Sequence, residues 1–457
     1  MAMQKLRQKM VAFLWFAAAL FILFIFLQWG LHFTSTRMLT MREKGYIAKI
    51  GNTMVKDDYY RKIVNNIARD TMLTPEEVEA IAFDNLVTEV IVDNEVREKG
   101  LMPSDETIIE LIKKYPPQEL RNDSSFLRED GTFDYDRYWE LLSDPRARPY
   151  FENYERLLRY NITRQRLFAE VTGYVRPTMQ ELWERYRERK TRMKIRGVRF
   201  VPQFDIDDAT IYQYYEAHKE EFKILAKPRF ECVMIPRNTE EGETKVGLVY
   251  SRLDKGEHWV SVVRDYGLTV DTIAGDTIAG IPLTYALKTY NEGHILAISS
   301  DDTVYYLRII YNPYMKSEPE YEYLTVEQAR NSITTTIYRQ RLAAYLDSIK
   351  PYFAKYRNKS KLSPWFTVVD TIWGITDRSF YYQVLGIDSG AVGKVVLDSC
   401  GYLVKVIDKK EPTIDEFQSD TTFVHDYIIQ YQQDFYNAWV ENLKHHTKIE
   451  DYRFYVR

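Results

Sequence analysis

Cysteine and histidine, the residue types that most often carry nucleophilic or metal chemistry, are few in this chain and widely spaced. Among 457 residues only Cys232 and Cys400 are cysteines, and the seven histidines stand in no metal-ligand spacing such as CxxC or HExxH. The sequence also has no Walker loop for phosphate, no GxGxxG for a dinucleotide and no GxSxG nucleophile motif. We therefore expect neither a metal nor a cofactor.

Cys232 is the residue whose type could act as a nucleophile. It lies in the apolar run 230–235, a pattern typical of a strand. A nucleophilic cysteine needs a base that takes its proton, and no base is paired with it in the sequence. A buried cysteine that serves as a small hydrophobic residue is the better interpretation. In an oxidising compartment Cys232 and Cys400 could form one disulfide, but a single pair does not define a disulfide-rich scaffold.

The amino-acid composition limits the kinds of molecule that the protein is expected to bind. Charged residues make up 28% of the chain and the formal net charge is −4, so the sequence gives no electrostatic support for binding a nucleic acid. Tyrosine stands out at 36 residues, mostly interleaved with charged ones. These tyrosines either fill half-buried positions in a protein with much surface, or form an adhesive aromatic surface for unfolded chains.

An apolar segment near the N-terminus indicates where in the cell the protein is located. Residues 11–29 carry no charge, and at about 1.5 Å per residue a helix of this length approaches the thickness of a bilayer's hydrocarbon core. The run is long for a signal peptide and no small-residue cleavage site follows it, so we expect an uncleaved anchor, with a cleaved signal peptide as the alternative. Residues 1–10, which contain Lys5, Arg7 and Lys9, are expected to stay in the cytoplasm, and the bulk of the chain in a periplasm-like compartment.

Local patterns predict the elements that position these residues. Residues 46–55 read as a hairpin around a Gly-Asn turn. Thr74, Pro75 and Glu77 form a capping box that begins a helix, and Gly100 suits its end. The remaining patterns predict helices beginning near 103 and 133 and spanning 151–171, 177–193, 326–350 and 426–445, and strands over 194–201, 230–235 and 304–310.

The order of these elements resembles a known family. The apolar segment ends in Trp-Gly, the hairpin reads Ile-Ala-Lys-Ile-Gly-Asn-Thr-Met-Val at 47–55, and Val-Arg-Glu-Lys-Gly-Leu-Met-Pro-Ser-Asp-Glu follows at 96–106. Together they are similar to the N-terminal chaperone domain of PpiD/SurA-like periplasmic folding factors. Residues 207–222 resemble the linker helix before that family's parvulin domain, and 435–443 resemble its closing helix. The family consists of envelope foldases that hold unfolded polypeptides, some with peptidyl-prolyl isomerase activity.

The resemblance implies an α+β chain that is mainly helical and divided into successive domains. These are a cytoplasmic tail (1–10), a transmembrane anchor (11–29), a SurA-like chaperone domain (46–225), a parvulin-like α/β domain (226–312) and a C-terminal helical lobe (320–457) with a partial parvulin-like unit (365–410).

The parvulin-like domain appears without its catalytic residues when it is compared with the family. An active parvulin lowers a barrier of about 18–20 kcal/mol for rotation of an amide bond, with an apolar proline pocket and a polar cluster that includes a histidine on each of two neighbouring strands. The first histidine position holds Cys232 and the second holds Tyr306, while the family's cysteine or aspartate position falls near Thr269. The loop after Asp276 is shorter than the family's and offers no counterpart of the residues that grip proline. In the C-terminal unit Leu403 stands at the histidine position, so no catalytic residue is predicted in either unit.

The expected function is that of a membrane-anchored chaperone in the inner membrane of a bacterium, with its bulk in the periplasm. Its partners would be unfolded envelope or secreted polypeptides, the membrane through residues 11–29, and the protein translocation channel, with no nucleic acid. Two alternatives remain open at this point: an active peptidyl-prolyl isomerase with an unfamiliar residue set, and a structural partner of an inner-membrane translocation complex.

Overall fold

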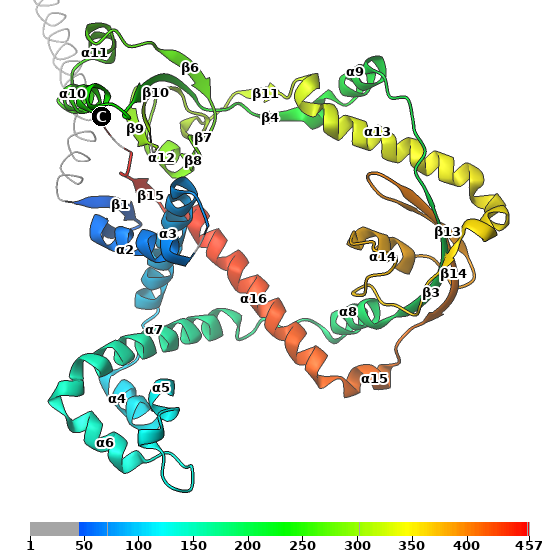
Figure 1. Cartoon of the computed structure of the whole chain (residues 1–457), viewed down its shortest axis with the longest axis horizontal. Coiled ribbons are helices and arrows are strands. Elements are labelled where there is room, and N and C mark those ends of the chain that lie inside the picture. Colours follow the sequence, from blue (N-terminus) through cyan, green and yellow to red (C-terminus); the bar gives the residue numbers. More distant parts are fainter. Residues whose placement is uncertain (1–44, 71, 301, 455, 457) are drawn as a thin grey trace, which may run out of the picture. The chain divides into compact units, whose positions relative to one another are not determined.

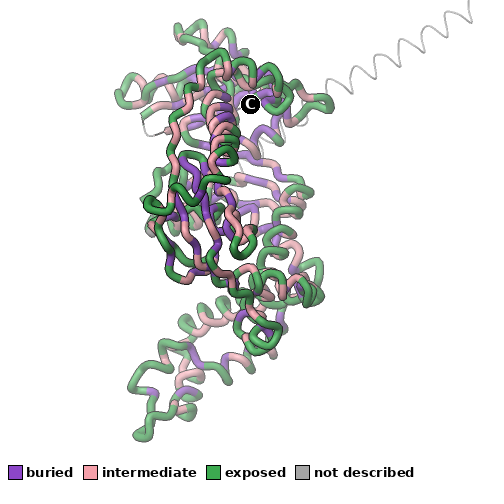
Figure 2. The backbone as a smooth tube through the Cα atoms, turned by 90° about the vertical axis from the view of Figure 1, so that its right-hand side faces the viewer, coloured by how far each residue is buried: buried purple, intermediate pink, exposed green. Residues whose placement is uncertain are grey.

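The computed structural model describes residues 45–70, 72–300, 302–454 and 456. The anchor predicted at 11–29 and the tail before it lie outside the described residues. Within the described ranges, no helix combines the length and apolar character needed to cross a bilayer. Helices and sheets both occur and helices hold more residues, which confirms the expected α+β class. Figure 2 shows buried residues as short stretches between exposed ones, as amphipathic elements require.

Contacts divide the chain into two compact units, each assembled from separate stretches of sequence. The first holds the described residues up to Leu167, together with Ala226–Glu320 and Trp439–Arg457; the second holds Phe168–Leu225 and Tyr321–Ala438. The units are therefore discontinuous, whereas the domains expected at 46–225, 226–312 and 320–457 follow one another along the chain.

The first unit begins with the predicted hairpin. Strands β1 (Tyr46–Ile50) and β2 (Thr53–Lys56) pair antiparallel, and β15 (Ile449–Asp451) adds to β1, giving the order β15-β1-β2. Helices α2 (Asp57–Asp70) and α3 (Pro75–Glu98) cover this sheet (Figure 1). The predicted capping box is confirmed, since the Thr74 hydroxyl accepts the Glu77 N–H and the Glu77 carboxylate accepts the Thr74 N–H.

A small helical region follows α3. Its predicted helices are present, and each begins at a side chain that caps the first turn: Ser104 for α4 and Asp134 for α6. The elements are α4 (Asp105–Lys114), α5 (Gln118–Arg121), η1 (Ser124–Phe126), α6 (Tyr135–Ser143), η2 (Pro145–Ala147) and α7 (Arg148–Thr172).

A four-stranded antiparallel sheet, the first sheet, lies in the part of this unit that the sequence assigns to a parvulin-like domain. Its order is β6-β5-β10-β9. One face packs against α10 and α11, and the other packs against α12 and a short hairpin of β7 and β8. The elements are β5 (Arg229–Pro236), α10 (Glu240–Asp254), α11 (Trp259–Asp265), β6 (Asp271–Ala274), β7 (Thr277–Ile278), β8 (Ile281–Pro282), α12 (Thr284–Thr289), β9 (Ile295–Ser299), β10 (Thr303–Tyr311) and η4 (Pro313–Met315).

The second unit contains a four-stranded antiparallel sheet, the second sheet, with the order β12-β3-β14-β13. In each sheet the strand that comes first in the sequence is the second strand across the sheet, and the strand that comes second in the sequence forms the edge beside it. A short helix precedes the remaining two strands in both. The two sheets therefore share one topology. The first strand of the second sheet, β3 (Arg192–Phe200), lies far along the sequence from the unit predicted at 365–410. After a long insertion the chain returns to this sheet with β12 (Lys361–Leu362), α14 (Arg378–Leu385), β13 (Val392–Val396) and β14 (Gly401–Lys410).

Helices surround the second sheet. Helix α13 packs on one face through Leu342 and Leu346, and α14 packs on the other. Leu403 pairs with Val198 and belongs to the face under α13. The remaining elements of this unit are α8 (Met179–Lys190), α9 (Asp208–Ala217), η3 (Lys219–Phe222), β4 (Lys223–Leu225), β11 (Tyr321–Tyr323), α13 (Val326–Ile349), η5 (Lys350–Lys359), α15 (Ile414–Ser419) and most of α16 (Thr421–His446).

Candidate functional site

The structure separates the three residues that the sequence analysis assigns to parvulin catalytic positions. Cys232 on β5 pairs in register with Leu307 of β10, whereas Tyr306 pairs with Val233. Paired residues project to the same face of a sheet and successive residues to opposite faces. Cys232 and Tyr306 therefore point to opposite faces, and Thr269 is exposed in the loop before β6.

The side chain of Cys232 is enclosed by apolar groups. It is 1% exposed and belongs to the cluster on the α12 side of the first sheet. The hairpin of β7 and β8 adds Ile278 and Ile281 to that cluster, on the stretch that follows Asp276. Burial, and after it the negative charge of Asp271, raises the pKa of the Cys232 thiol to about 11. A thiol in this state is a poor nucleophile.

Asp271 is an acidic residue beside Cys232 that the sequence analysis did not single out. It lies directly opposite Cys232 on β6, two positions beyond the expected Thr269. Counting back along the strand from the Gly275-Asp276 turn could have found it, because β6 ends just before that turn. Cys232 and Cys400 are both free thiols, so the disulfide considered from the sequence is not formed.

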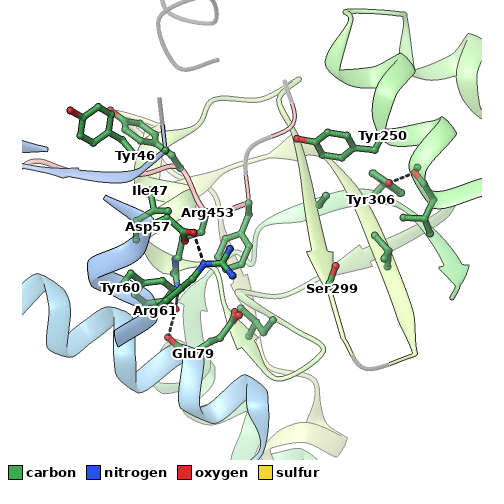
Figure 3. A pocket seen from close by; sticks show the side chains of 18 residues that line it. Tyr46, Ile47, Asp57, Tyr60, Arg61, Glu79, Tyr250, Ser299, Tyr306 and Arg453 are labelled. Atoms are coloured by element: carbon green, nitrogen blue, oxygen red, sulfur yellow. Dashed lines mark hydrogen bonds and ion pairs between the residues drawn. The ribbon is translucent and has the colours of Figure 1, made fainter. Parts of the chain in front are cut away.

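Tyr306 is buried on the opposite face of the first sheet. Its hydroxyl donates a hydrogen bond of 2.8 Å to the Val246 carbonyl of α10, and burial raises its pKa. This hydroxyl is therefore held as a neutral donor to the backbone. In Figure 3 it points toward α10 and away from the cavity that its ring borders.

That cavity, in the first unit, has a volume of about 560 Å³. The N-terminal hairpin and α2 form one wall, and α10, β9 and β10 form another (Figure 3). Six of its eighteen lining residues are aromatic, and two arginines and two carboxylates, Asp57 and Glu79, lie among them. The aromatic residues and the arginines are Tyr46, Tyr60, Arg61, Tyr250, Tyr306, Tyr452, Arg453 and Phe454.

The C-terminal residues complete the cavity wall. The Ala297 N–H donates to the Phe454 carbonyl (2.8 Å) and the Val456 N–H donates to the Ile295 carbonyl (3.0 Å), so Phe454 and Val456 lie along the edge of β9 that β10 does not pair with. Beside it, Arg453 and Asp451 form an almost fully buried ion pair of 2.9 Å. This pair fixes the C-terminus to the N-terminal helices, because the Arg453 guanidinium also lies over the Phe83 ring of α3.

The chemistry that the cavity offers is binding. Its tyrosine and phenylalanine rings provide apolar area with polar ends, which suits a polypeptide segment. Across the described ranges, no cluster of three or more histidine, cysteine or acidic side chains could hold a metal ion.

A second candidate surface lies on the small helical region. Tyr115, Tyr135 and Trp139 are 50%, 39% and 51% exposed. The rings of Tyr135 and Trp139 are 6.2 Å apart between centroids, and the Tyr135 hydroxyl reaches the Lys114 carbonyl beside Tyr115. We call these three residues the aromatic face. Its base is rigid, since Tyr138 on the inner side of α6 is fully buried and donates to the Ile112 carbonyl.

Comparison with protein families gives one match. Residues 3–142 match the model described as the SurA-like N-terminal domain, which confirms that part of the resemblance. The matched residues include the whole aromatic face. No curated protein matches the sequence.

Solved structures of a SurA-like chaperone and of PrsA proteins are similar at low identity. A SurA-like chaperone of Campylobacter jejuni is 11% identical over 70% of this chain and 98% of its own, with a TM-score of 0.19. The foldase PrsA of Lactococcus lactis is 12% identical over 70% and 94% (TM-score 0.14), and PrsA of Bacillus subtilis is 13% identical over 88% and 91% (TM-score 0.15). These TM-scores are too low to support an argument about shape or function.

Proposed function

We propose that this protein is a folding chaperone that binds unfolded polypeptides in the periplasm while anchored to the inner membrane. The observation that carries the proposal is the aromatic face, in which the exposed rings of Tyr135 and Trp139 are neighbours and the exposed Tyr115 follows the carbonyl that the Tyr135 hydroxyl reaches, all within the SurA-like domain. Exposed aromatic side chains on a rigid base can cover apolar side chains of an unfolded chain without a deep pocket. The aromatic cavity of the first unit supplies a further surface of the same character.

The parvulin-like sheet is proposed to act in binding or spacing and not in catalysis. The argument is the placement of Cys232 and Tyr306, which face away from one another and are each held by burial in the neutral form. Amide isomerisation requires groups that converge on one proline, and the residues at these positions do not converge. The alternative of an active isomerase would need a different set of groups.

Membrane anchoring rests on residues 11–29 of the sequence. An anchor there would hold the chain beside the channel from which secreted polypeptides emerge, and would raise its effective concentration near them. Weak contacts at several surfaces would then suffice for capture. Replacement of residues 11–29 with an unrelated apolar helix tests the role of the anchor, because a general chaperone tolerates the exchange and a dedicated partner of a translocation complex does not.

The direct test of the proposal is aggregation of an unfolded reporter protein in the presence of the full chain in lipid nanodiscs. The wild-type protein is expected to suppress aggregation, and a variant with Tyr115→Ser, Tyr135→Ser and Trp139→Ser is expected to bind the client about tenfold more weakly. Folded reporter should not compete.

A matched control replaces three tyrosines of similar exposure in the second unit, Tyr212, Tyr352 and Tyr382, by serine. This control should retain binding. If both triple variants lose binding equally, or if neither does, the aromatic face is not the client surface.

A further inference from the structure

The second sheet carries a groove that the proposed function does not use. Its volume is about 620 Å³, and β3, the end of η5, the loop before α14 and the turn between β13 and β14 form it. Both aromatic and cationic side chains line it, chiefly Arg199, Phe200, Lys359, Lys361, Trp373 and Tyr402. A hollow of this size accommodates several side chains of a peptide.

Trp373 forms the fixed aromatic wall of the groove. Its backbone has φ +54°, a left-handed conformation that is unfavourable for tryptophan and persists where the surroundings enforce it. Its ring lies directly on β3 at Gly197, where a Cβ atom would stand 2.9 Å from two ring carbons. The ring can pack against β3 because Gly197 has no side chain, and the backbone conformation of Trp373 directs the ring toward the groove.

The charges of the groove are unbalanced. Three cations, Arg199, Lys359 and Lys361, line it together with one carboxylate, Asp377. The groups that surround the Arg199 guanidinium are the Cys400 thiol and the hydroxyls of Tyr402 and Tyr338, not carboxylates. Asp377 already caps α14 by accepting the Ser379 N–H. Among the described residues none of the three cations has an ion-pair partner, although the chain as a whole is acidic.

The groove also borders an unpaired strand edge. Strand β12 pairs with β3 only at Lys361–Gly197 and Leu362–Arg196. From Val198 to Phe200, β3 pairs with β14 on one side and has no strand partner on the other side within the described part of the chain. Backbone groups at such an edge can pair with an extended polypeptide.

We propose that this groove binds an extended, acidic polypeptide segment. The segment adds as a strand beside Val198–Phe200, its carboxylates pair with Arg199, Lys359 and Lys361, and an apolar or proline side chain packs on Trp373. The inference rests on the proposed function only for the source of the segment, an unfolded client. The groove is thus a second binding site, in the second unit, and it prefers negatively charged segments, whereas the aromatic face has no such preference.

The test measures binding of a short fluorescent peptide rich in Asp, Glu, Pro and Phe to the full chain in nanodiscs by anisotropy. The acidic peptide should bind, and the same peptide with lysine in place of its acidic residues should not. Replacing Lys359→Gln and Lys361→Gln should weaken binding about tenfold, since two exposed ion pairs contribute together about 1.4 kcal/mol. Higher salt should weaken binding to the wild type more than to this variant.

The control variant is Lys355→Gln with Arg357→Gln, which removes the same charge from exposed side chains of the same segment outside the groove. It should bind the acidic peptide as the wild type does. Equal binding of the lysine peptide, or equal loss in both double variants, overturns the proposal. So does tighter binding of a single-stranded oligonucleotide, which would make the groove a general polyanion site. No unfolded client is present in this assay, so its failure and a failure to suppress aggregation are independent results.

Discussion

Cys232 and Tyr306 lie on neighbouring strands of one sheet and point to opposite faces of it. Cys232 is opposite Leu307 in the cluster under α12, and Tyr306 is opposite Val233 in the cluster under α10 and α11. Two side chains on opposite faces cannot act on one bond. This relationship argues against joint catalysis by the two residues at the predicted parvulin positions. Four predictions about the chain's residues can be tested directly.

The first prediction concerns the Cys232 thiol and alkaline pH. Its pKa is raised from 9.0 to about 11 in the folded protein. Above pH 9 the unfolded chain loses this proton while the folded protein keeps it, so the stability contributed by the neutral thiol is full below pH 9 and is lost by about pH 11. Urea unfolding in a reducing buffer should show a steeper fall in stability across this range for the wild type than for Cys232→Ala. Equal slopes would contradict the buried, neutral thiol.

The second prediction concerns isomerase activity. Refolding of a reporter limited by proline isomerisation should not be accelerated by the protein, and near-stoichiometric protein should slow it by holding the unfolded chain. Tyr306→Phe removes the hydrogen bond to Val246 and should cost about 1 kcal/mol of stability without changing the refolding rate. A faster slow phase that disappears in Tyr306→Phe or Cys232→Ala would establish the isomerase alternative.

The third prediction concerns the buried ion pair of Arg453 and Asp451. Arg453→Ala leaves a carboxylate with no exposure and should lower the free energy of unfolding by about 3–5 kcal/mol. Hydrogen exchange should become faster at the amides of β15 and at those of β1 that pair with it. The control is Lys448→Ala, which removes a mostly exposed side chain that pairs with the partly buried Glu450; the expected loss is below about 1 kcal/mol. Similar losses in both variants would show that burial of the pair is unimportant.

The fourth prediction concerns the contact of Gly197 with Trp373. Gly197→Ala places a methyl group against the indole ring and should destabilise the second unit by about 1–3 kcal/mol. Combined with Trp373→Ala the loss should be smaller than the sum of the two single losses, because the clash is gone. Gly247→Ala is the control: it lies inside α10 with nothing near its Cβ position, and alanine there should be neutral or stabilising. Additive losses at Gly197 and Trp373 would contradict the contact.

Local sequence determined the elements that depend on near neighbours. The hairpin at 46–55 and the capping box of Thr74 and Glu77 were predictable because their hydrogen bonds join residues a few positions apart. The run 230–235 could be assigned to a strand for the same reason, since its apolar residues are adjacent in the sequence. The aromatic residues of the SurA-like domain can be located in the sequence too, but the sequence does not distinguish those that are exposed from those in the core.

Only the tertiary structure decided which strands pair and in which register. Strand β3 joins β14 across a long insertion, and β15 returns from the C-terminus to β1, and neither partner is marked by a local pattern. A shift of one residue in register moves a side chain to the other face of a sheet, which is why Cys232 and Tyr306 could be matched to one site from sequence and yet lie apart. The groove beside Trp373 depends on the same kind of information, because its wall, its charges and its open edge come from segments that meet only when the second sheet has formed.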